Sequence, residues 1–156
     1  MEIRILGIDP GNYKTGYSVI SVKGNNCNLI DSDVIISKKR PENLKKIYNT
    51  LSEIIDLHNV NEIALESSFF SKNVQSLIRL GEVRGVILLL SSVFDIEIYE
   101  YTPQRVKNAI TGYGWSGKDQ VLQMVKYIFK KEVNNHDEAD AIAVAFCHFL
   151  NRKSVK

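Results

Sequence analysis

The chain opens with three segments rich in β-branched and aromatic residues. The first, residues 3–9, is short and apolar and stops at Pro10-Gly11, which predicts a mostly buried strand with an abrupt end. Residues 15–22 and 27–36 have the same extended character, and the turn-forming stretch 23–26 separates them. We therefore expect a three-stranded meander whose first strand ends at Asp9.

The pattern then alternates between helical and extended periods. Apolar residues recur with helical spacing from 44 to 55, after a proline at 41 that suits a first turn. Residues 61–66 return to extended character. Residues 74–93 predict a long helix whose second half is apolar on every side, so we expect that half to be deeply enclosed. Gly81 and Gly85 in this helix allow close approach, either of another part of the chain or of a second subunit.

The last third of the chain predicts one strand and three helices. Residues 96–101 form the strand, and residues 103–110, 118–131 and 135–150 form the helices, with a glycine-rich loop at 112–117. Alanines alternate along the last helix, and such small side chains let it lie close against a sheet. No repeat or linker divides the sequence, which indicates a single α/β domain over 1–156 with a mixed sheet. A Rossmann fold would begin with a βαβ unit instead.

The length and composition exclude several classes of protein. A chain of 156 residues, 44% of them hydrophobic, needs no disulfide or structural metal merely to fold. No apolar stretch approaches the roughly 20 residues that a membrane span requires, and the first residues lack the features of a signal peptide. We therefore expect a cytoplasmic protein. Cys27 and Cys147 are far apart and form no CxxC motif, which favours reduced thiols packed as small hydrophobes.

The net charge of +2 hides an uneven distribution. Residues 72–131 carry nine Lys or Arg against five Asp or Glu, whereas each flank has one more acid than base. This asymmetry indicates a surface for a polyanion beside an acidic site. A solvated charged face is the alternative explanation.

Four carboxylates occupy positions where catalytic groups are often found. Asp9 ends the first predicted strand and Glu66 the fourth, so the two would emerge side by side if those strands are parallel neighbours. Asp137 and Asp140 lie three residues apart near the start of the last helix and share one helical face. Four clustered anions repel each other unless divalent cations neutralise them, and such hard oxygen ligands favour Mg²⁺ or Mn²⁺.

Each of these acids also has an ordinary structural explanation. Asp9 precedes a proline and could begin a turn, and Glu66 could be a solvated residue at a strand end. The two aspartates could stabilise a helix N-terminus, which contributes roughly 0.3 to 1 kcal/mol for each. His136 beside Asp137 leaves open which of the two groups would be a metal ligand.

The surroundings of the acids narrow the choice of substrate. Aromatic and cationic residues lie in the loop predicted after Glu66, and more cations lie in the basic middle third. Cations that contact phosphates and aromatics that stack on bases are what a nucleic-acid enzyme needs. For the aromatics, a small satellite core is the alternative. The candidate residues for DNA binding are Phe69, Lys72, Asn73, Arg79, Arg84 and Arg105, and the basic middle third also supplies Lys107 and Lys118.

A set of motifs along almost the whole chain resembles the RuvC family of bacterial Holliday-junction resolvases. The motifs are Gly7-Ile8-Asp9-Pro10-Gly11 with Thr15-Gly16, Ala64-Leu65-Glu66, Leu80-Gly81-Glu82-Val83-Arg84-Gly85-Val86, Tyr101-Thr102-Pro103, and Asp137-Glu138-Ala139-Asp140-Ala141-Ile142-Ala143 with His148. The resemblance covers about residues 3–150. It implies an RNase H-like fold, a five-stranded mixed β-sheet flanked by α-helices. It also implies a homodimer that acts on four-way DNA junctions together with the branch-migration proteins RuvA and RuvB.

The resemblance carries over to particular residues. The catalytic acids of the family fall on Asp9, Glu66, Asp137 and Asp140. Lys107 and Lys118 match basic positions near the active-site cleft, and Phe69 matches an aromatic that acts at the junction. Some relatives have a histidine at the position of Asp137, but the three-residue spacing to Asp140 favours Asp137 over His136.

The mechanism expected from these residues is hydrolysis with two Mg²⁺ ions per active site, for which Mn²⁺ can substitute. Asp9 would bridge both ions, Glu66 would complete one site, and Asp137 with Asp140 would complete the other. Lys107 or Lys118 would stabilise charge on the phosphate. The products would carry 5′-phosphate and 3′-hydroxyl ends, and two symmetric cuts would require a two-fold dimer.

Three other functions are consistent with some of the same sequence features. A related RuvC-like or YqgF-like nuclease would act on RNA or on other branched DNA, and a junction-binding protein would not cut at all. Actin-like ATPases and sugar kinases share the first strand and its turn, but they need a second lobe for which 156 residues leave no room.

Overall fold

The computed structural model describes residues 1–68 and 73–154 of the chain. The strands and helices expected from the sequence are all present within this part, with boundaries that differ by a few residues. In chain order the elements are β1 (Glu2–Asp9), β2 (Lys14–Lys23), β3 (Asn26–Ile36), α1 (Glu42–His58), β4 (Glu62–Glu66), α2 (Val74–Val93), β5 (Glu97–Tyr101), α3 (Pro103–Thr111), α4 (Lys118–Phe129) and α5 (His136–Ser154).

The five strands form one mixed sheet in the order β3-β2-β1-β4-β5. The meander of β1, β2 and β3 is antiparallel, whereas β1 pairs in parallel with β4, and β4 in parallel with β5. The crossover through α1 brings β4 beside β1. The carboxyl ends of β1, β4 and β5 therefore meet at one edge of the sheet, and the expected RNase H-like sheet is confirmed.

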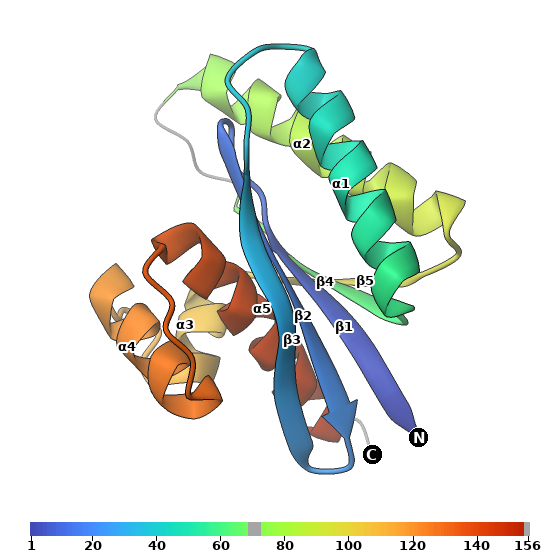
Figure 1. Cartoon of the computed structure of the whole chain (residues 1–156). Helices are drawn as coiled ribbons and strands as arrows, with labels where there is room; N and C mark the ends of the chain where they lie inside the picture. Colours follow the sequence, from blue (N-terminus) through green and yellow to red (C-terminus); the bar gives the residue numbers. More distant parts are fainter. Residues whose placement is uncertain (69–72, 155–156) are drawn as a thin grey trace.

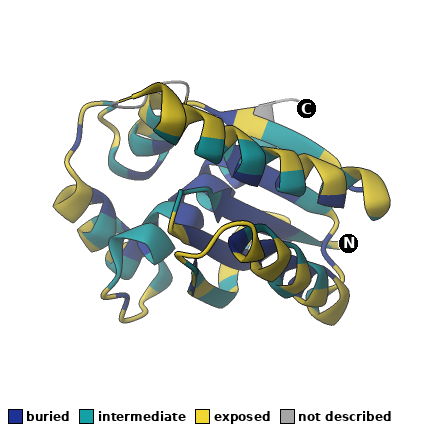
Figure 2. Ribbon diagram, turned by 90° about the horizontal axis from the view of Figure 1, so that it is seen from above, coloured by how far each residue is buried: buried dark blue, intermediate teal, exposed yellow. Residues whose placement is uncertain are grey.

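Helices cover both faces of the sheet (Figure 1): α1 and α2 lie on one face, and α3, α4 and α5 lie on the other. The two-residue period of β1 divides its side chains between two cores. Leu6 and Ile8 pack under α1 and α2, whereas Ile5 packs under α5. Figure 2 shows the buried strands enclosed between two helical layers whose outer surfaces carry the exposed residues.

The sheet approaches α5 unusually closely at two glycines. A Cβ atom on Gly7 would lie 2.4 Å from the carbonyl oxygen of Ala141, and one on Gly16 would lie 2.1 Å from that of Asp137. The hydroxyl of Ser18 donates a hydrogen bond to the same Ala141 oxygen at 2.9 Å. This contact, which the alanines of the sequence predicted, holds the first turns of α5 directly over β1 and β2.

The expectation that the second half of α2 is deeply enclosed is wrong. Its buried residues are Val83, Ile87 and Leu90, which form one stripe over the sheet. Leu89 and Val93 are each more than half exposed. A run of apolar residues does not reveal which side of a helix meets the core, so composition alone overestimated the burial.

The glycines of α2 lie on an open side of the helix. A Cβ atom added to Gly81 or Gly85 would meet no atom within 4 Å in the described part of the chain. Packing within the domain, one of the two explanations considered for these glycines, is therefore not seen among the described residues.

Two smaller expectations can be compared with the structure. Among residues 1–68 and 73–154, no helix combines the length and apolarity needed to cross a membrane. Cys27 is half-buried and Cys147 is buried, and both are in the thiol form.

Candidate active site

Asp9 and Glu66 are adjacent at the carboxyl edge of the sheet. Ile8 of β1 pairs with Leu65 of β4, so the next residue of each strand emerges beside the other. Two residues before these acids, Gly7 and Ala64 face α5. Since side chains alternate along a strand, Asp9 and Glu66 point to the same face as their predecessors, toward α5.

Asp137 and Asp140 come to this point from the first turns of α5. The backbone N–H groups of Asp137 and Glu138 donate to Oδ1 of Asn135, at 2.8 and 3.3 Å. Asn135 thus caps the N-terminus of α5, a role that the sequence alone left open for the two aspartates. The carboxylates of Asp137 and Asp140 remain available to face the sheet.

The pKa values show that these carboxyls share one environment. Burial, followed by the charges of Glu66, Asp140 and Asp137, raises the pKa of Asp9 well above its ordinary value. Burial and then the charge of Glu66 raise the pKa of Asp140 to about 7, with Asp137 acting in the same direction. The structure therefore brings the four acids predicted from the sequence within electrostatic range of one another.

Asp9 and Glu66 relieve part of this repulsion by sharing a hydrogen bond. Burial raises the pKa of Glu66, although the hydrogen bond with Asp9 opposes the shift. In the described residues, no three Asp, Glu, His or Cys side chains already converge on one point as ligands. The donor set is nonetheless made only of carboxylate oxygens, and a hard divalent cation would relieve the same repulsion as the shared proton. The residues therefore fit such a cation.

The two predicted lysines lie on the helices beside the acids. Lys107 of α3 and Lys118, the first residue of α4, both act on Glu66 and lower its pKa, although burial prevails. The charge of Lys118 also opposes the rise in the pKa of Asp140. Both cations are thus close enough to the acids to act on a bound phosphate.

Arg84 reaches the site from α2. It lines a small pocket together with Asp9, Glu66 and Ser67. Its guanidinium donates to the Ser67 hydroxyl at 3.2 Å and forms an ion pair with Glu100 of β5. Neither partner could be predicted from a local pattern, because both contacts join separate elements of the fold.

Three other predicted DNA-binding residues make contacts with neighbouring parts of the fold. Arg79 donates to the hydroxyl of Tyr13 at 3.4 Å. Arg105 donates to Asn151 at 2.8 Å, with its guanidinium 5.1 Å from the centre of the Tyr101 ring. Asn73 caps α2 through a bond from the N–H of Ser76.

Two predictions for DNA binding concern Phe69 and Lys72. Both residues lie outside the part of the chain that the structure describes.

His136 stands near the acids without taking the place of Asp137. Its Nε2 atom is 3.4 Å from Oδ1 of Asp119, and its charge opposes the rise in the pKa of Asp140. Its Nδ1 atom is buried and has no hydrogen-bond partner among the described residues.

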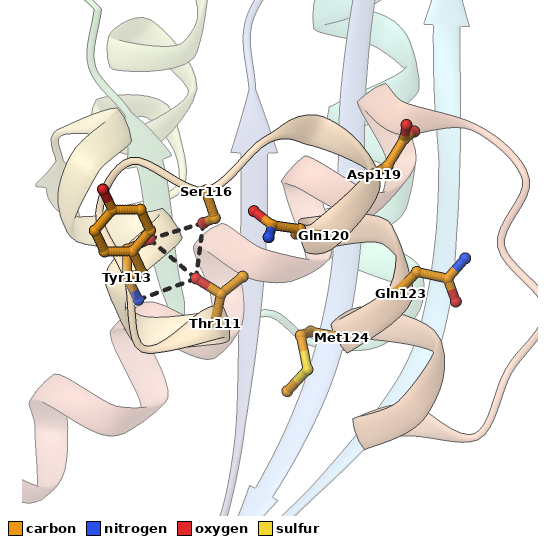
Figure 3. Close-up of a pocket in the computed structure, with 7 residues that line it drawn as sticks. All are labelled: Thr111, Tyr113, Ser116, Asp119, Gln120, Gln123 and Met124. Carbon is orange, nitrogen blue, oxygen red and sulfur yellow. Dashed lines mark hydrogen bonds between the residues drawn. The ribbon is translucent and has the colours of Figure 1, made fainter.

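A cavity of about 400 Å³ lies between the 112–117 loop and α4, and none of the four acids lines it (Figure 3). Its hydroxyl groups bond to one another: Thr111 Oγ1 lies 2.7 Å from Ser116 Oγ, which donates to the Tyr113 carbonyl oxygen at 2.7 Å. The hydroxyl groups of Thr111 and Ser116 are therefore already hydrogen-bonded.

The geometry agrees with comparisons with known proteins. Residues 5–148 match the family described as "Crossover junction endodeoxyribonuclease RuvC". A protein of that name from Petrotoga mobilis is 45% identical, over 97% of this chain and 96% of the relative. The structure of Thermus thermophilus RuvC in complex with a Holliday junction substrate superposes with a TM-score of 0.90 at 26% identity, over 98% of this chain and 96% of that one.

A more distant structure supports the fold alone. The yeast mitochondrial Holliday junction resolvase Ydc2 has a TM-score of 0.64 at 15% identity, over 99% of this chain and 86% of that one. The extent of the family match and the identity to its members are decisive. The chain belongs to the RuvC family of crossover junction endodeoxyribonucleases, which are metal-dependent nucleases.

Proposed function

We propose that this chain resolves Holliday junctions by cutting two strands symmetrically, leaving 5′-phosphate and 3′-hydroxyl ends. The observation that carries the proposal is the gathering of Asp9, Glu66 and Asp140 from β1, β4 and α5 at one edge of the sheet. A four-way DNA junction as substrate is supported by the Thermus thermophilus relative, whose structure contains one.

The same acids would hold two Mg²⁺ ions, with Mn²⁺ as a substitute. When bound, such ions stabilise negative charge on a phosphate and lower the pKa of a bound water. Asp9 is the acid best placed to be shared, because the charges of all three other acids act on it. Glu66 would then serve one ion, and Asp137 with Asp140 the other.

The cations around the acids have a complementary task. Lys107 and Lys118 would stabilise the charge that develops on the scissile phosphate, since both already act on Glu66. Arg84 would hold a neighbouring phosphate at the rim of the pocket that it shares with Asp9. Phe69, Lys72, Asn73, Arg79 and Arg105 remain predicted DNA contacts.

Two cuts in one junction require two copies of the site, which a two-fold dimer supplies. The exposed side of α2 is the surface best suited to pair the copies. It presents Leu77, Ile78 and Leu89, which are 40%, 59% and 53% exposed, next to two glycines that permit close approach. RuvA and RuvB are the proposed partners on the DNA, and the cytoplasm is the proposed location.

Cleavage of synthetic substrates tests the proposal. The protein should cut a four-way junction in Mg²⁺ and not in EDTA, and it should leave linear duplex and RNA intact. Preferential cutting of RNA would favour the YqgF-like alternative, and binding without cutting would favour a structural junction-binding protein.

Variants separate binding from cutting in the same assay. Asp9→Asn and Glu66→Gln should bind the junction and fail to cut it, whereas normal cutting by either would remove the proposed metal site. Phe69→Ala should weaken cleavage more than binding.

A further inference from the structure

A buried chain of polar side chains lies at the opposite end of α5 from the acids. The hydroxyl of Tyr101 is 2.6 Å from Nδ1 of His148, and Nε2 of His148 is 2.7 Å from Oε2 of Glu62. Arg152 donates to both oxygens of Glu62, from Nε at 2.7 Å and from Nη2 at 3.0 Å. Tyr101, His148, Glu62 and Arg152 are called the relay below.

The chemistry of the relay fixes the direction of its hydrogen bonds. Although burial alone would raise the pKa of Glu62, hydrogen bonds from Arg152 and His148 hold it below its ordinary value, so Glu62 is an accepting carboxylate. Burial lowers the pKa of His148, whose ring is therefore neutral and carries its proton on Nε2. Nδ1 is then an acceptor, and the Tyr101 hydroxyl donates to it.

The relay joins three elements through one side chain. Glu62 begins β4, Tyr101 ends β5, and His148 and Arg152 belong to the carboxyl half of α5. His148 is 2% exposed, and its ring stacks on Tyr99 with the ring centres 4.3 Å apart. Since both ring nitrogens are bonded and one ring face is covered, the orientation of His148 is fixed.

Nearer the acids, two further directional bonds join α5 to the sheet. Ser18 of β2 donates to the carbonyl oxygen of Ala141 at 2.9 Å, and Ser32 of β3 donates to Oε1 of Glu138. Gly7 and Gly16 also face this part of α5 at close range.

A helix that shifts by one turn moves about 5.4 Å, and a shift in register of one residue rotates its side chains by about 100°. Either change would carry Asp140 away from Asp9. The relay opposes both changes from the far end of α5.

Tyr101 connects the relay to the acid site through the sheet. It pairs with Glu66 in the β4–β5 register, and its carbonyl oxygen accepts the N–H of Ser67 at 2.9 Å. The residue that holds His148 thus also fixes the backbone on both sides of Glu66. His148 itself lies eight residues from Asp140, about 12 Å along the helix, so it acts only through the elements that it joins.

We propose that His148 is a positioning residue, which bonds Tyr101 and Glu62 at once and thereby holds Asp137 and Asp140 of α5 in place against Asp9 and Glu66. The inference rests on the proposed function of these acids as the metal site. Its consequence is that losing either bond of His148 weakens metal binding without removing any ligand.

Three variants and one matched control test this role. Tyr101→Phe removes one hydroxyl, His148→Asn keeps an acceptor near Nδ1 but loses the bond to Glu62, and His148→Gln keeps a donor near Nε2 but loses the bond to Tyr101. Val125→Ala removes buried volume from the same core, on α4, and changes no residue of α5 or of the relay. Tyr101→Phe keeps the ring in place, so it gives an answer even if a His148 variant fails to fold.

Three measurements at a temperature well below unfolding decide the outcome. In calorimetric titrations with Mn²⁺, the relay variants should bind about tenfold more weakly than the wild type, as expected for residues that orient ligands indirectly. Their single-turnover cleavage rate should fall at low Mg²⁺ and recover at high Mg²⁺, with junction affinity unchanged. In metal-free protein, the backbone amide NMR signals of residues 137–140 should shift.

The control separates positioning from general stability. Val125→Ala should match the wild type in metal affinity and in the signals of residues 137–140, even where its loss of stability equals that of a relay variant. Unshifted signals in Tyr101→Phe, or metal binding no weaker than in Val125→Ala, would overturn the proposal. The NMR comparison needs neither metal nor junction, so its result is independent of whether the proposed function holds.

Discussion

Glu62 and Glu66 stand at opposite ends of β4 and meet opposite environments. Glu62 accepts hydrogen bonds from Arg152 and His148, which hold its pKa below the ordinary value despite burial. Glu66 is buried beside Asp9 and Asp140, and its pKa is raised although two lysines oppose the shift. At one end of β4 a carboxylate is paired with hydrogen-bond donors, and at the other end several carboxylates lie together.

The difference shows how one strand and one helix combine stability with function. Paired charges at Glu62 and Arg152 fix α5 on the sheet, whereas the acids at the other end repel each other until a cation arrives. Such repulsion costs folding free energy and is tolerated where the site needs it for binding. Substitutions at the two ends of β4 should therefore have different effects on cleavage and stability.

The largest effect is expected when the acid end loses its shared carboxylate. Asp9→Asn should lower the single-turnover cleavage rate of a four-way junction at least about a thousandfold, equivalent to about 4 kcal/mol. Its stability in EDTA should be equal to or greater than that of the wild type, because a source of repulsion is gone. Glu53→Gln, an exposed acid on α1, serves as the control and should cut normally.

The paired end should respond in the opposite way. Arg152→Ala leaves Glu62 with His148 as its remaining ion-pair partner among the described residues. It should cost up to about 3 kcal/mol of unfolding free energy, the lower end for a buried ion pair, because this pair is partly exposed. Urea denaturation measures the loss. Lys126→Ala, which removes an ion pair to the exposed Glu132, should cost less than about 0.5 kcal/mol. Equal losses for the two variants would contradict the assignment of Glu62 as a stabilising partner.

A pH series sharpens the contrast further. The pKa of Asp140 is about 7 in the fold against an ordinary value of 3.8, so the unfolded chain loses this proton first as the pH rises. This group therefore costs no stability below about pH 3.8, and its cost grows between about pH 3.8 and pH 7 and then levels off. In EDTA at pH 8, Asp140→Asn should be more stable than the wild type by about 2 kcal/mol. Parallel stability curves for the two proteins between pH 5 and pH 7, a range in which the cost should still be growing, would contradict this cause.

The smallest effect concerns the cation itself. Adding Mg²⁺ at about ten times its dissociation constant should raise the unfolding free energy of the wild type by about 1.4 kcal/mol. Glu66→Gln should show little of this gain, since it removes a proposed ligand. A wild-type protein whose thermal midpoint does not respond to Mg²⁺ or Mn²⁺ would argue against the site.

Much of the fold and the acid site follows from local sequence patterns. The strand that stops at Pro10 places Asp9 at its exit, and the three-residue spacing of Asp137 and Asp140 puts both on one helical face. These are short-range features that periodicity can reveal. The crossover through α1 then implies that Glu66 lies beside Asp9, as the parallel pairing of β1 and β4 confirms.

Two kinds of feature could not be predicted from the sequence: contacts between residues far apart in the chain, and the side of a helix that faces the core. Tyr101 and Glu62 lie 47 and 86 residues from His148, so no local pattern joins them. The apolar run of α2 predicted a hydrophobic helix but not which side of it meets the sheet. Its exposed face was therefore not predicted. Both require knowledge of how elements pack in three dimensions.

The central claim is that the two ends of β4 have different tasks, and one measurement tests it directly. Single-turnover cleavage of a four-way junction in Mg²⁺ is compared for Glu66→Gln and Glu62→Gln, with the unfolding free energy of each. We predict that Glu66→Gln loses cleavage at least about a thousandfold and keeps its stability, whereas Glu62→Gln stays within about tenfold of the wild-type rate and is less stable. Cleavage by Glu66→Gln near the wild-type rate, or an equal loss in both variants, would contradict the account.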